Sequence, residues 1–400
     1  MENLSQHANP LLPIHAARGA EMQRYGQIEI VSTFGQPQAE YAAIHKSCGM
    51  MDQPYRGFLE VTGRDRLSFL NGIISNTTFD KQAKKPIAPG THVYAFMLNL
   101  KGRIVCDMNV LELGGRTLLE MDARLVESMK QLFEQYVFSE QVKFASRLGE
   151  LHQVALYGPH SANVLQHAGA TMADPQSSAS AINIDGISCV AWHDNPTGTG
   201  GLNLVVPKEQ VQQCWNHLMR QADEVADIGK RALRPVGWAA FNACRIEAGR
   251  ALFGIDFDGV PPQSAYPTRK AQSEVESHDG GTGVLPAETG ALYLRATALN
   301  KCYIGQEIVA RMHARQVVAR RIVGIRMEGD VLPIAGAPIL DDAGDQIGIV
   351  TSSTVSPILG NAAICLGFVK RPYFEVGTKL SIPAEGATGI GQVVELPFRR

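Results

Sequence analysis

Residues 299–321 of this chain read LNKCYIGQEIVARMHARQVVARR, a stretch that places a thiol, an amide and a carboxylate close together ahead of several cations. Neighbouring positive charge lowers the pKa of a thiol and increases its thiolate fraction, so Cys302 is a candidate reactive cysteine. The alternative is a buried structural cysteine ahead of a solvated basic helix, because free cysteine is usually a small core residue. The density of polar groups favours a functional site, whose candidate residues are Lys301, Cys302, Tyr303, Gly305, Gln306, Glu307 and Arg311.

The composition is that of an ordinary globular protein with two or three domains. The chain has 400 residues, of which 45% are hydrophobic and 19% charged, and its formal net charge is −2. Such a balance gives no overall attraction to nucleic acid or to an anionic membrane. Any site for a polyanion must therefore be a local patch.

The cysteines and the apolar runs indicate the cellular compartment of the protein. Seven cysteines are spread along the chain without a CxxC pair, which indicates neither a zinc site nor a cysteine-held cluster. No apolar run approaches the roughly 18–20 residues that span a bilayer, and the first 30 residues lack the apolar core of a signal peptide. We expect a cytoplasmic protein with reduced thiols, no membrane contact and no metal.

The first two thirds of the chain show one pattern twice. Residues 1–40 read as a mixed lead-in. A strand, a glycine turn at Gly63 and a short helix follow, then strands over 95–100, 104–111 and 117–121 and a helix over 124–137. A second strand–glycine–helix unit begins at Gly158, and an amphipathic helix follows Pro207. This repetition predicts two similar α+β halves, each with helices on one face of a small sheet.

The last third predicts a helix, a long insertion and a barrel. Residues 231–254 predict a helix and turn that end at Gly249, and residues 256–290 are rich in Pro, Ser and Gly, which is typical of an insertion or mobile loop. Short strands at regular spacing then predict a small β-barrel, with strands around 322–327, 337–340, 346–352, 364–369 and 378–382. The expected domains are 1–145, 146–317 and 318–400.

The segment from Asn300 to Glu307, NKCYIGQE, resembles the KGCYxGQE signature of the YgfZ family. The resemblance implies a folate-binding protein that supports iron–sulfur enzymes, with iron–sulfur proteins or cluster-assembly factors as partners. The chain departs from the signature at its start, where Asn300-Lys301 replaces Lys-Gly. A single cysteine cannot hold a cluster alone, so a cluster role for Cys302 needs ligands from a partner.

The wider layout is similar to the glycine-cleavage T-protein (GcvT) superfamily, which includes YgfZ. The likeness extends over nearly the whole chain and is carried further by residues 49–52, 98–107, 245–249 and 350–359. It implies an α+β GcvT/YgfZ-like fold, in which two related ferredoxin-like domains and a C-terminal β-barrel surround a central folate pocket. Tetrahydrofolate, or a one-carbon derivative of it, is the implied cofactor.

The same resemblance assigns roles to individual residues. Asp107 matches a carboxylate beside the reactive nitrogens of tetrahydrofolate, where it would accept or orient a proton; the neighbouring position, an aspartate in T-proteins, is Cys106 here. Glu247 matches the glutamate that holds the pterin through two hydrogen bonds. Each residue also has a simpler structural explanation. Asp107 could cap a neighbouring turn, and Glu247 could lie on a helix surface and pair with Arg250. Further folate-binding positions implied by the likeness are Asn99, Arg245 and Asp122.

Three functions follow from these patterns. The leading hypothesis is a tetrahydrofolate-binding, YgfZ-like protein for iron–sulfur cluster assembly or repair, with Cys302 as its functional thiol. The second is a folate-dependent aminomethyltransferase or demethylase of T-protein type, the activity to expect if the protein is an enzyme. The third is a tRNA-modification accessory protein that binds RNA through the basic stretch, although that stretch lacks stacking aromatics.

Overall fold

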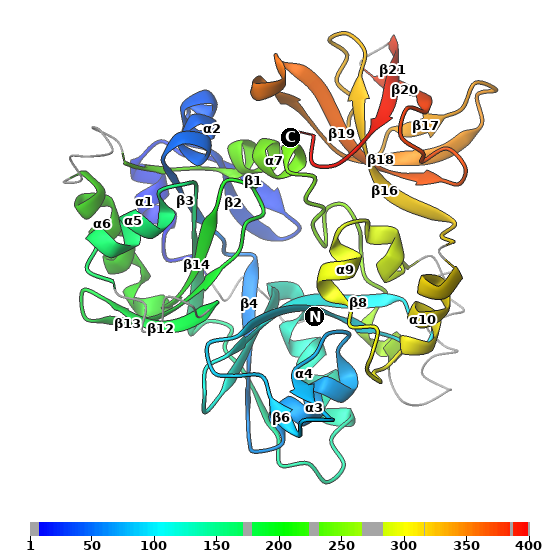
Figure 1. Cartoon of the computed structure of the whole chain (residues 1–400). Coiled ribbons are helices and arrows are strands. Elements are labelled where there is room, and N and C mark those ends of the chain that lie inside the picture. Colours follow the sequence, from blue (N-terminus) through cyan, green and yellow to red (C-terminus); the bar gives the residue numbers. More distant parts are fainter. Residues whose placement is uncertain are drawn as a thin grey trace. The chain divides into compact units, whose positions relative to one another are not determined.

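The structure, shown in Figure 1, is a computed structural model that describes residues 8–170, 178–223, 232–265, 283–315, 317–384 and 387–398. The chain forms two compact units. The first unit comprises residues 1–70, 78–94 and 108–241, and the second comprises residues 71–77, 95–107 and 242–400. A single unit thus collects segments that are far apart in the sequence.

The N-terminal segment is more structured than its sequence predicts. It contains α1 (Leu12–Ala17), β1 (Glu21–Tyr25), β2 (Ile28–Thr33) and α2 (Pro37–Lys46). Pro13 and Pro37 lie in the first turns of the two helices, where the missing N–H of proline costs nothing. The buried Glu40 accepts hydrogen bonds from the Thr33 hydroxyl and from the backbone N–H of Gly237. These bonds fix α2 to the strand before it and to a distant part of the same unit.

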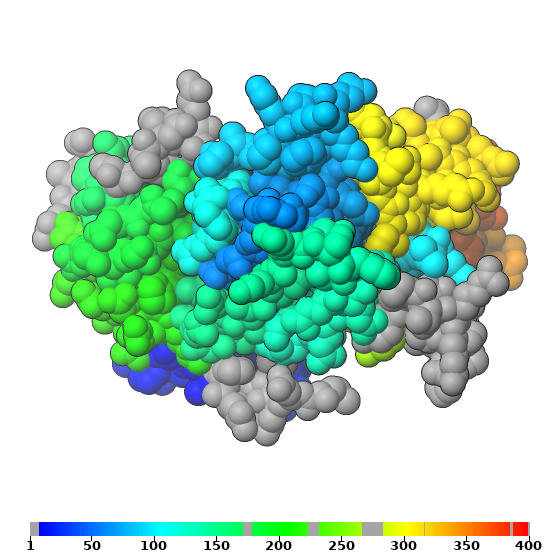
Figure 2. Space-filling view, turned by 90° about the horizontal axis from the view of Figure 1, so that it is seen from below, coloured from blue at the N-terminus to red at the C-terminus, as the bar shows by residue number. Residues whose placement is uncertain are grey.

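A five-stranded sheet confirms the first predicted group of strands. Its order is β10 (Lys143–Ser146), β4 (Arg56–Thr62), β9 (Thr117–Asp122), β8 (Ile104–Glu112) and β7 (His92–Leu98). The associated helices are α3 (Arg66–Ile73) and α4 (Val126–Gln135), the latter preceded by η2 (Ala123–Leu125). The Phe144 ring lies 5.7 Å from both Phe69 and Phe133, so the two helices and the edge strand share a core. Residues of both helices reach the surface shown in Figure 2.

A small hairpin of β5 (Phe79–Asp80) and β6 (Lys85–Pro86) lies beyond α3 along the chain. It precedes β7 and was not predicted from the sequence.

A six-stranded sheet forms the other layer of the first unit. Its order is β12 (Ala179–Ile184), β13 (Ile187–His193), β14 (Gly201–Pro207), β11 (Leu151–Tyr157), β3 (Cys48–Asp52) and β15 (Leu233–Pro235). Its helical elements are α5 (Ser161–His167), η3 (Lys208–Gln210) and α6 (Val211–Asp223). The predicted apolar stripe of α6 is buried as expected, at Val211, Cys214, Trp215 and Leu218.

The sequence predicts a helix and turn over 231–254, with the helix ending at Gly249, and the described residues from 232 onward differ from this prediction at their start. Leu233–Pro235 is β15, which pairs in parallel with β3. The helix α7 begins only at Trp238 and ends at Glu247. Gly249 follows it with a φ of +67°, a conformation that glycine adopts without strain, and this agrees with the predicted end of the helix. The residues that the sequence pattern assigns to the first turn of the helix therefore form a strand that pairs with β3.

The second unit contains short helices between α7 and the barrel. They are η5 (Pro262–Ala265), η6 (Pro286–Thr289), α9 (Leu292–Ala296) and α10 (Gln306–Arg315). About half of the insertion predicted over 256–290, residues 266–282, lies outside the described residues.

The C-terminal segment forms the predicted β-barrel. The barrel is closed, in the order β16 (Arg320–Met327), β19 (Ala362–Lys370), β18 (Gln346–Ser356), β17 (Pro338–Leu340), β20 (Lys379–Ala384) and β21 (Ala387–Val394). The turn η7 (Pro357–Leu359) joins β18 to β19. The sequence predicted five of these strands and missed β21, which closes the barrel against β16.

The expected α+β class with a closing barrel is thus confirmed. Among the described residues, no helix is long and apolar enough to cross a membrane.

Gly63 allows a test of the first unit, since its φ is +105° and an added Cβ would lie 2.0 Å from the carbonyl oxygen of Gln141. We expect Gly63→Ala to lower the free energy of unfolding by about 2 kcal/mol or more, because strain and a backbone clash combine. The matched control is Gly72→Ala, which meets nothing within 4 Å in α3. Urea unfolding followed by circular dichroism would give both values. Equal stability of the two variants would contradict the geometry.

Candidate functional site

The NKCYIGQE segment is fixed in the second unit by the residues around its cysteine. The Lys301 ammonium donates hydrogen bonds to the carbonyl oxygens of Ile74, at 2.9 Å, and of Asn76. Tyr303 is buried. Gly305 has a φ of +78°, and a Cβ there would lie 2.5 Å from the carbonyl oxygen of Asn99. Glycine is therefore required at this position, both for the backbone conformation and for the close approach.

Asn99 organises the turn against which this segment packs. Its Oδ1 accepts hydrogen bonds from the backbone N–H groups of Lys101 and Arg103, both at 3.0 Å. Gly102 follows with a positive φ, and a Cβ there would lie 2.8 Å from Ile308 of α10. The structure thus brings together two candidate positions, Asn99 and Gly305, that are about two hundred residues apart in the sequence. The contacts seen for Asn99 shape the turn, and its role in folate binding stays a prediction.

Cys302 differs from the other cysteines of the chain. Its side chain is exposed, whereas the remaining six cysteines are buried, and all seven are free thiols. The two residues beside it provide the anchors, Lys301 to a neighbouring loop and Tyr303 to the interior. An exposed thiol held between two anchored neighbours is positioned to react with a molecule that reaches the surface.

Two tyrosine hydroxyls lie in or shortly before this segment in the sequence: that of Tyr303, a candidate residue, and that of Tyr293, which the sequence analysis did not single out. Neither Tyr293 nor Tyr303 has a hydrogen-bond partner for its enclosed hydroxyl among the described residues. Burial raises the pKa of both hydroxyls, so both are protonated donors at neutral pH. Such groups are available to a ligand or an ordered water.

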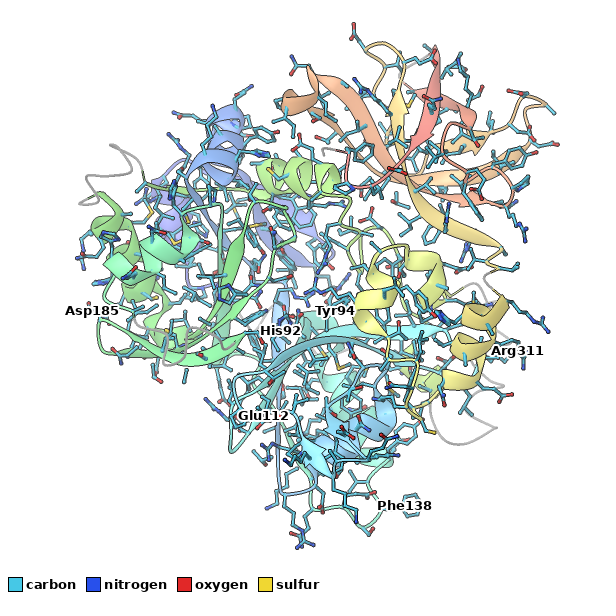
Figure 3. The ribbon with its side chains drawn as sticks, in the orientation of Figure 1. His92, Tyr94, Glu112, Phe138, Asp185 and Arg311 are labelled. Carbon is cyan, nitrogen blue, oxygen red and sulfur yellow. The ribbon has the colours of Figure 1, made fainter. Side chains whose placement is uncertain are left out.

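The basic stretch that follows does not form one open patch. Arg311 lies on α10, where Figure 3 labels it, and its guanidinium is 3.6 Å from the Glu307 carboxylate. Arg320 is 3.4 Å from Glu288, and Arg321 lies over the Phe374 ring and donates to the Phe374 carbonyl oxygen. The Arg311–Glu307 pair is exposed, whereas Arg320 and Arg321 are engaged by partners within the protein, which weakens the interpretation of the whole stretch as one RNA-binding surface.

Arg245 belongs to a buried ion pair inside the second unit. Its guanidinium donates to the carboxylate of Asp256, and both side chains are fully enclosed. It also donates to the Ser352 hydroxyl, at 2.5 Å, and to Oδ1 of Asn242, at 2.9 Å. Asp256 in turn accepts from Ser352 and Thr351. Direct contact of Arg245 with a folate stays a prediction, and it would require these bonds to open.

Glu247 is enclosed at the end of α7. Its carboxylate accepts a hydrogen bond from the Ser356 hydroxyl at 2.5 Å, and its carbonyl oxygen accepts from the backbone N–H of Phe398. Both partners lie in the C-terminal segment, so Glu247 ties the helix to it. The expected pterin contact stays a prediction beside this structural role.

Asp107 lies in the second unit on β8, a strand whose nine residues are all buried. The residue is 7% exposed, so its carboxylate is largely removed from water. The adjacent Cys106 thiol donates a hydrogen bond to the backbone carbonyl oxygen of Asp107, at 2.9 Å. A carboxylate in such surroundings is a suitable proton acceptor, because low polarity strengthens its electrostatic interactions.

Asp122 lies in the first unit and has its own partners. It accepts hydrogen bonds from the Tyr25 hydroxyl at 2.7 Å and from the Arg124 guanidinium at 2.6 Å. Burial disfavours its charge, but the bonds from Arg124 outweigh burial and hold the pKa of Asp122 below its usual value. Asp122 also caps η2 through the backbone N–H of Arg124. The expectation that it contacts folate stays a prediction.

A buried polar cluster in the first unit was missed by the sequence analysis. The side-chain amide of Gln53 donates to the Tyr157 hydroxyl at 2.9 Å, and that of Gln153 donates to Oδ1 of Asn203 at 3.4 Å and to Oε1 of Gln53 at 2.6 Å. The Tyr157 ring stacks on Phe241, with ring centroids 5.3 Å apart. The signal in the sequence that could have revealed this cluster is the presence of polar residues within otherwise apolar strands. These bonds join polar side chains of β11, β14 and the residue after β3 inside the first unit.

Comparisons with known proteins agree with this architecture. The GCVT N-terminal domain family matches residues 11–261, and the glycine cleavage T-protein C-terminal barrel domain matches residues 320–399. A probable aminomethyltransferase of Natronomonas pharaonis is 26% identical over 402 residues, covering 99% of both chains. An aminomethyltransferase of Thermotoga neapolitana is 25% identical and covers 98% of this chain and 97% of its own.

A solved structure shows the same fold. The glycine cleavage system aminomethyltransferase T from Bartonella henselae superimposes with a TM-score of 0.73 at 19% identity, covering 97% of each chain. The relatives named here are aminomethyltransferases. The T-protein superfamily expected from the sequence is therefore confirmed, whereas the narrower YgfZ assignment stays a prediction.

The buried ion pair generates a stability prediction. We expect Asp256→Asn to lower the free energy of unfolding by about 3–5 kcal/mol, because it leaves the enclosed Arg245 charge without its partner. The control is the exposed Asp258, whose change to Asn should alter stability by less than about 0.5 kcal/mol. Chemical denaturation of both variants provides the measurement. A loss below about 1 kcal/mol for Asp256→Asn would show that the pair does not hold the unit together.

Cysteine exposure generates a second prediction. In the folded protein, a thiol-reactive dye such as Ellman's reagent should modify Cys302 rapidly and the six buried cysteines only on unfolding, since reaction requires access to the thiolate. Cys302→Ser should remove the rapid phase. A rapid phase that persists in this variant would place another cysteine at the surface.

Proposed function

We infer the function of this chain from one premise: it belongs to the glycine cleavage T-protein family, through both its GCVT N-terminal domain and its C-terminal barrel domain. Tetrahydrofolate, the cofactor expected from the sequence, is the one this family uses. We propose that this chain binds tetrahydrofolate and transfers an aminomethyl carbon to it, as an aminomethyltransferase of T-protein type.

The observation that carries this proposal is the carboxylate of Asp107, on a strand whose residues are all buried. In the proposed step, the carbon of a thiol-bound aminomethyl group becomes bonded to the two reactive nitrogens of tetrahydrofolate. The carbon–sulfur and carbon–nitrogen bonds of the donor break, and the free thiol and ammonia leave with the two protons of the folate nitrogens. Asp107 would accept or orient one of these protons, a role that a fixed carboxylate of low exposure suits.

Cys302 supports a second candidate function. Its exposure and the anchoring of its neighbours give the NKCYIGQE segment a thiol that the aminomethyl transfer does not use. This observation favours a YgfZ-like role, in which the folate-binding chain supports iron–sulfur cluster assembly or repair through that thiol. The two functions are tested by different substitutions, Asp107→Asn for the transfer and Cys302→Ala for the thiol.

The transfer function predicts a specific loss in Asp107→Asn. With S-aminomethyl dihydrolipoamide as donor, the rate of methylenetetrahydrofolate formation should fall by about 100-fold, the usual scale for a lost general base. The affinity for tetrahydrofolate should change little, because the substitution keeps the shape of the side chain. Asp258→Asn, an exposed change in the same unit, is the control. A wild-type rate in Asp107→Asn would contradict the assigned role.

The thiol function predicts a different result in cells. In a host that lacks the endogenous chain, Cys302→Ala should fail to restore the activity of iron–sulfur enzymes, whereas the purified variant should keep full folate binding and aminomethyl transfer. The activities of enzymes that contain no iron–sulfur cluster, measured in the same cells, provide the internal reference. If Cys302→Ala restores cluster enzymes fully, the YgfZ-like function is wrong.

A further inference from the structure

A cavity of about 370 Å³ lies in the first unit, at a place that none of the site residues above occupies. Its wall combines the N-terminal segment with the starts of β2 and β11 and with η3. Its apolar side is formed by Leu12, Ile28, Pro54, Ala123, Leu148 and Leu151. Its volume falls within the range of pockets that hold small organic ligands.

One polar wall of the cavity is a histidine with a fixed orientation. His152 lines the cavity, and its Nε2 is 2.6 Å from Oδ1 of the buried Asp52. Oδ2 of Asp52 accepts from Asn9 at 2.6 Å and faces Nε2 of His15 at 2.7 Å. Burial opposes the charge of Asp52, but the two imidazoles outweigh it and hold the pKa of this carboxyl below its usual value. Because the ionised carboxylate only accepts hydrogen bonds, both Nε2 atoms must carry a proton.

This arrangement leaves the second ring nitrogen of His152 for other partners. In the neutral ring, Nδ1 accepts a hydrogen bond, and in the protonated ring it donates one. His15 lies deeper, where its ring meets Phe34 and Trp215 edge to face. The buried Asp52 therefore holds a hydrogen-bonding ring in a fixed orientation at the wall of the cavity.

A second polar wall carries an unneutralised charge. Lys208 lines the cavity and is half-buried, and burial lowers the pKa of its ammonium. Among the described residues, no carboxylate lies within 4.0 Å of this ammonium. The guanidinium of Arg56, also in the wall, is occupied by Glu120. A half-buried cation without a counter-ion indicates a site for an anionic group.

The remaining charges of the cavity lie at its rim. Arg24 and Glu29 are exposed and face each other across β1 and β2. They largely offset one another, so Lys208 sets the charge preference of the interior. A phosphate would need several converging donors, whereas one ammonium beside apolar walls matches a carboxylate on an apolar body.

We propose that this cavity binds a small organic acid, with Lys208 as the counter-charge to its carboxylate, His152 as a fixed hydrogen-bonding wall, and the apolar side chains around its body. The described lining of this cavity includes neither the residues expected to contact folate nor Cys302. The proposed ligand therefore binds to residues of the first unit alone.

The test is a calorimetric titration of the full chain with hexanoate, hexanol, hexylamine and inorganic phosphate. We expect saturable binding of hexanoate, and binding of the other three that is at least about tenfold weaker, the scale of one lost charged hydrogen bond. Nuclear magnetic resonance of the His152 ring should report the same saturation, which places the ligand in this cavity rather than elsewhere.

Three variants make the test specific. Lys208→Gln should weaken hexanoate binding about tenfold, and Ile28→Trp should abolish it by filling the cavity. Lys143→Gln, an exposed change on β10 outside the cavity, should leave it unchanged. The proposal is overturned by equal affinity of wild type and Lys208→Gln, by tighter binding of phosphate or hexylamine, or by no hexanoate binding up to about 10 mM.

Discussion

The second unit depends on one buried ion pair, between Arg245 and Asp256. It joins the end of α7, the loop after it and the barrel strand β18, because Ser352 bonds both partners and Thr351 bonds the aspartate. Two charges removed from water are tolerated only when their geometry and remaining hydrogen bonds are satisfied. The pair is satisfied on both sides. It therefore specifies how the helix meets the barrel, and Glu247 adds a second tie through Ser356.

The exposure of Cys302 follows from contacts made by its neighbours. Lys301 is held by two carbonyl oxygens, Tyr303 is buried, and Gly305 lets the backbone approach Asn99. With positions on both sides fixed, the cysteine between them is turned outward. The same segment can therefore belong to a folate protein of T-protein architecture and still carry a chemistry of its own.

Local patterns in the sequence predicted most of the individual elements. The regular spacing of short strands predicted the barrel, and the apolar stripe of α6 predicted which face of that helix is buried. The pairings that cannot be read locally were missed. The sequence does not show that β3 enters the six-stranded sheet between β11 and β15, since its partners are distant in the chain. For the same reason, β15 was taken for part of a helix.

The sequence proposed the residue types of the candidate site but could not give their surroundings. Motif likeness proposed Cys302, Asp107, Arg245 and Glu247, whose roles stay predictions, whereas the exposure and the partners of each depend on its folded environment. Arg245 is enclosed by an aspartate eleven positions further on, and the cluster of Asp52 with two histidines spans segments from α1 to β11. Such contacts arise from tertiary packing and leave no periodic trace in the sequence.

Calorimetric titration of the purified wild-type chain with tetrahydrofolate tests the central claim most directly, because both proposed functions require the protein to bind this molecule. We expect saturable binding at one site per chain, with an affinity in the micromolar range, about −8 kcal/mol. The absence of binding at millimolar tetrahydrofolate, in protein shown to be folded, would contradict the account and leave the family fold serving another purpose.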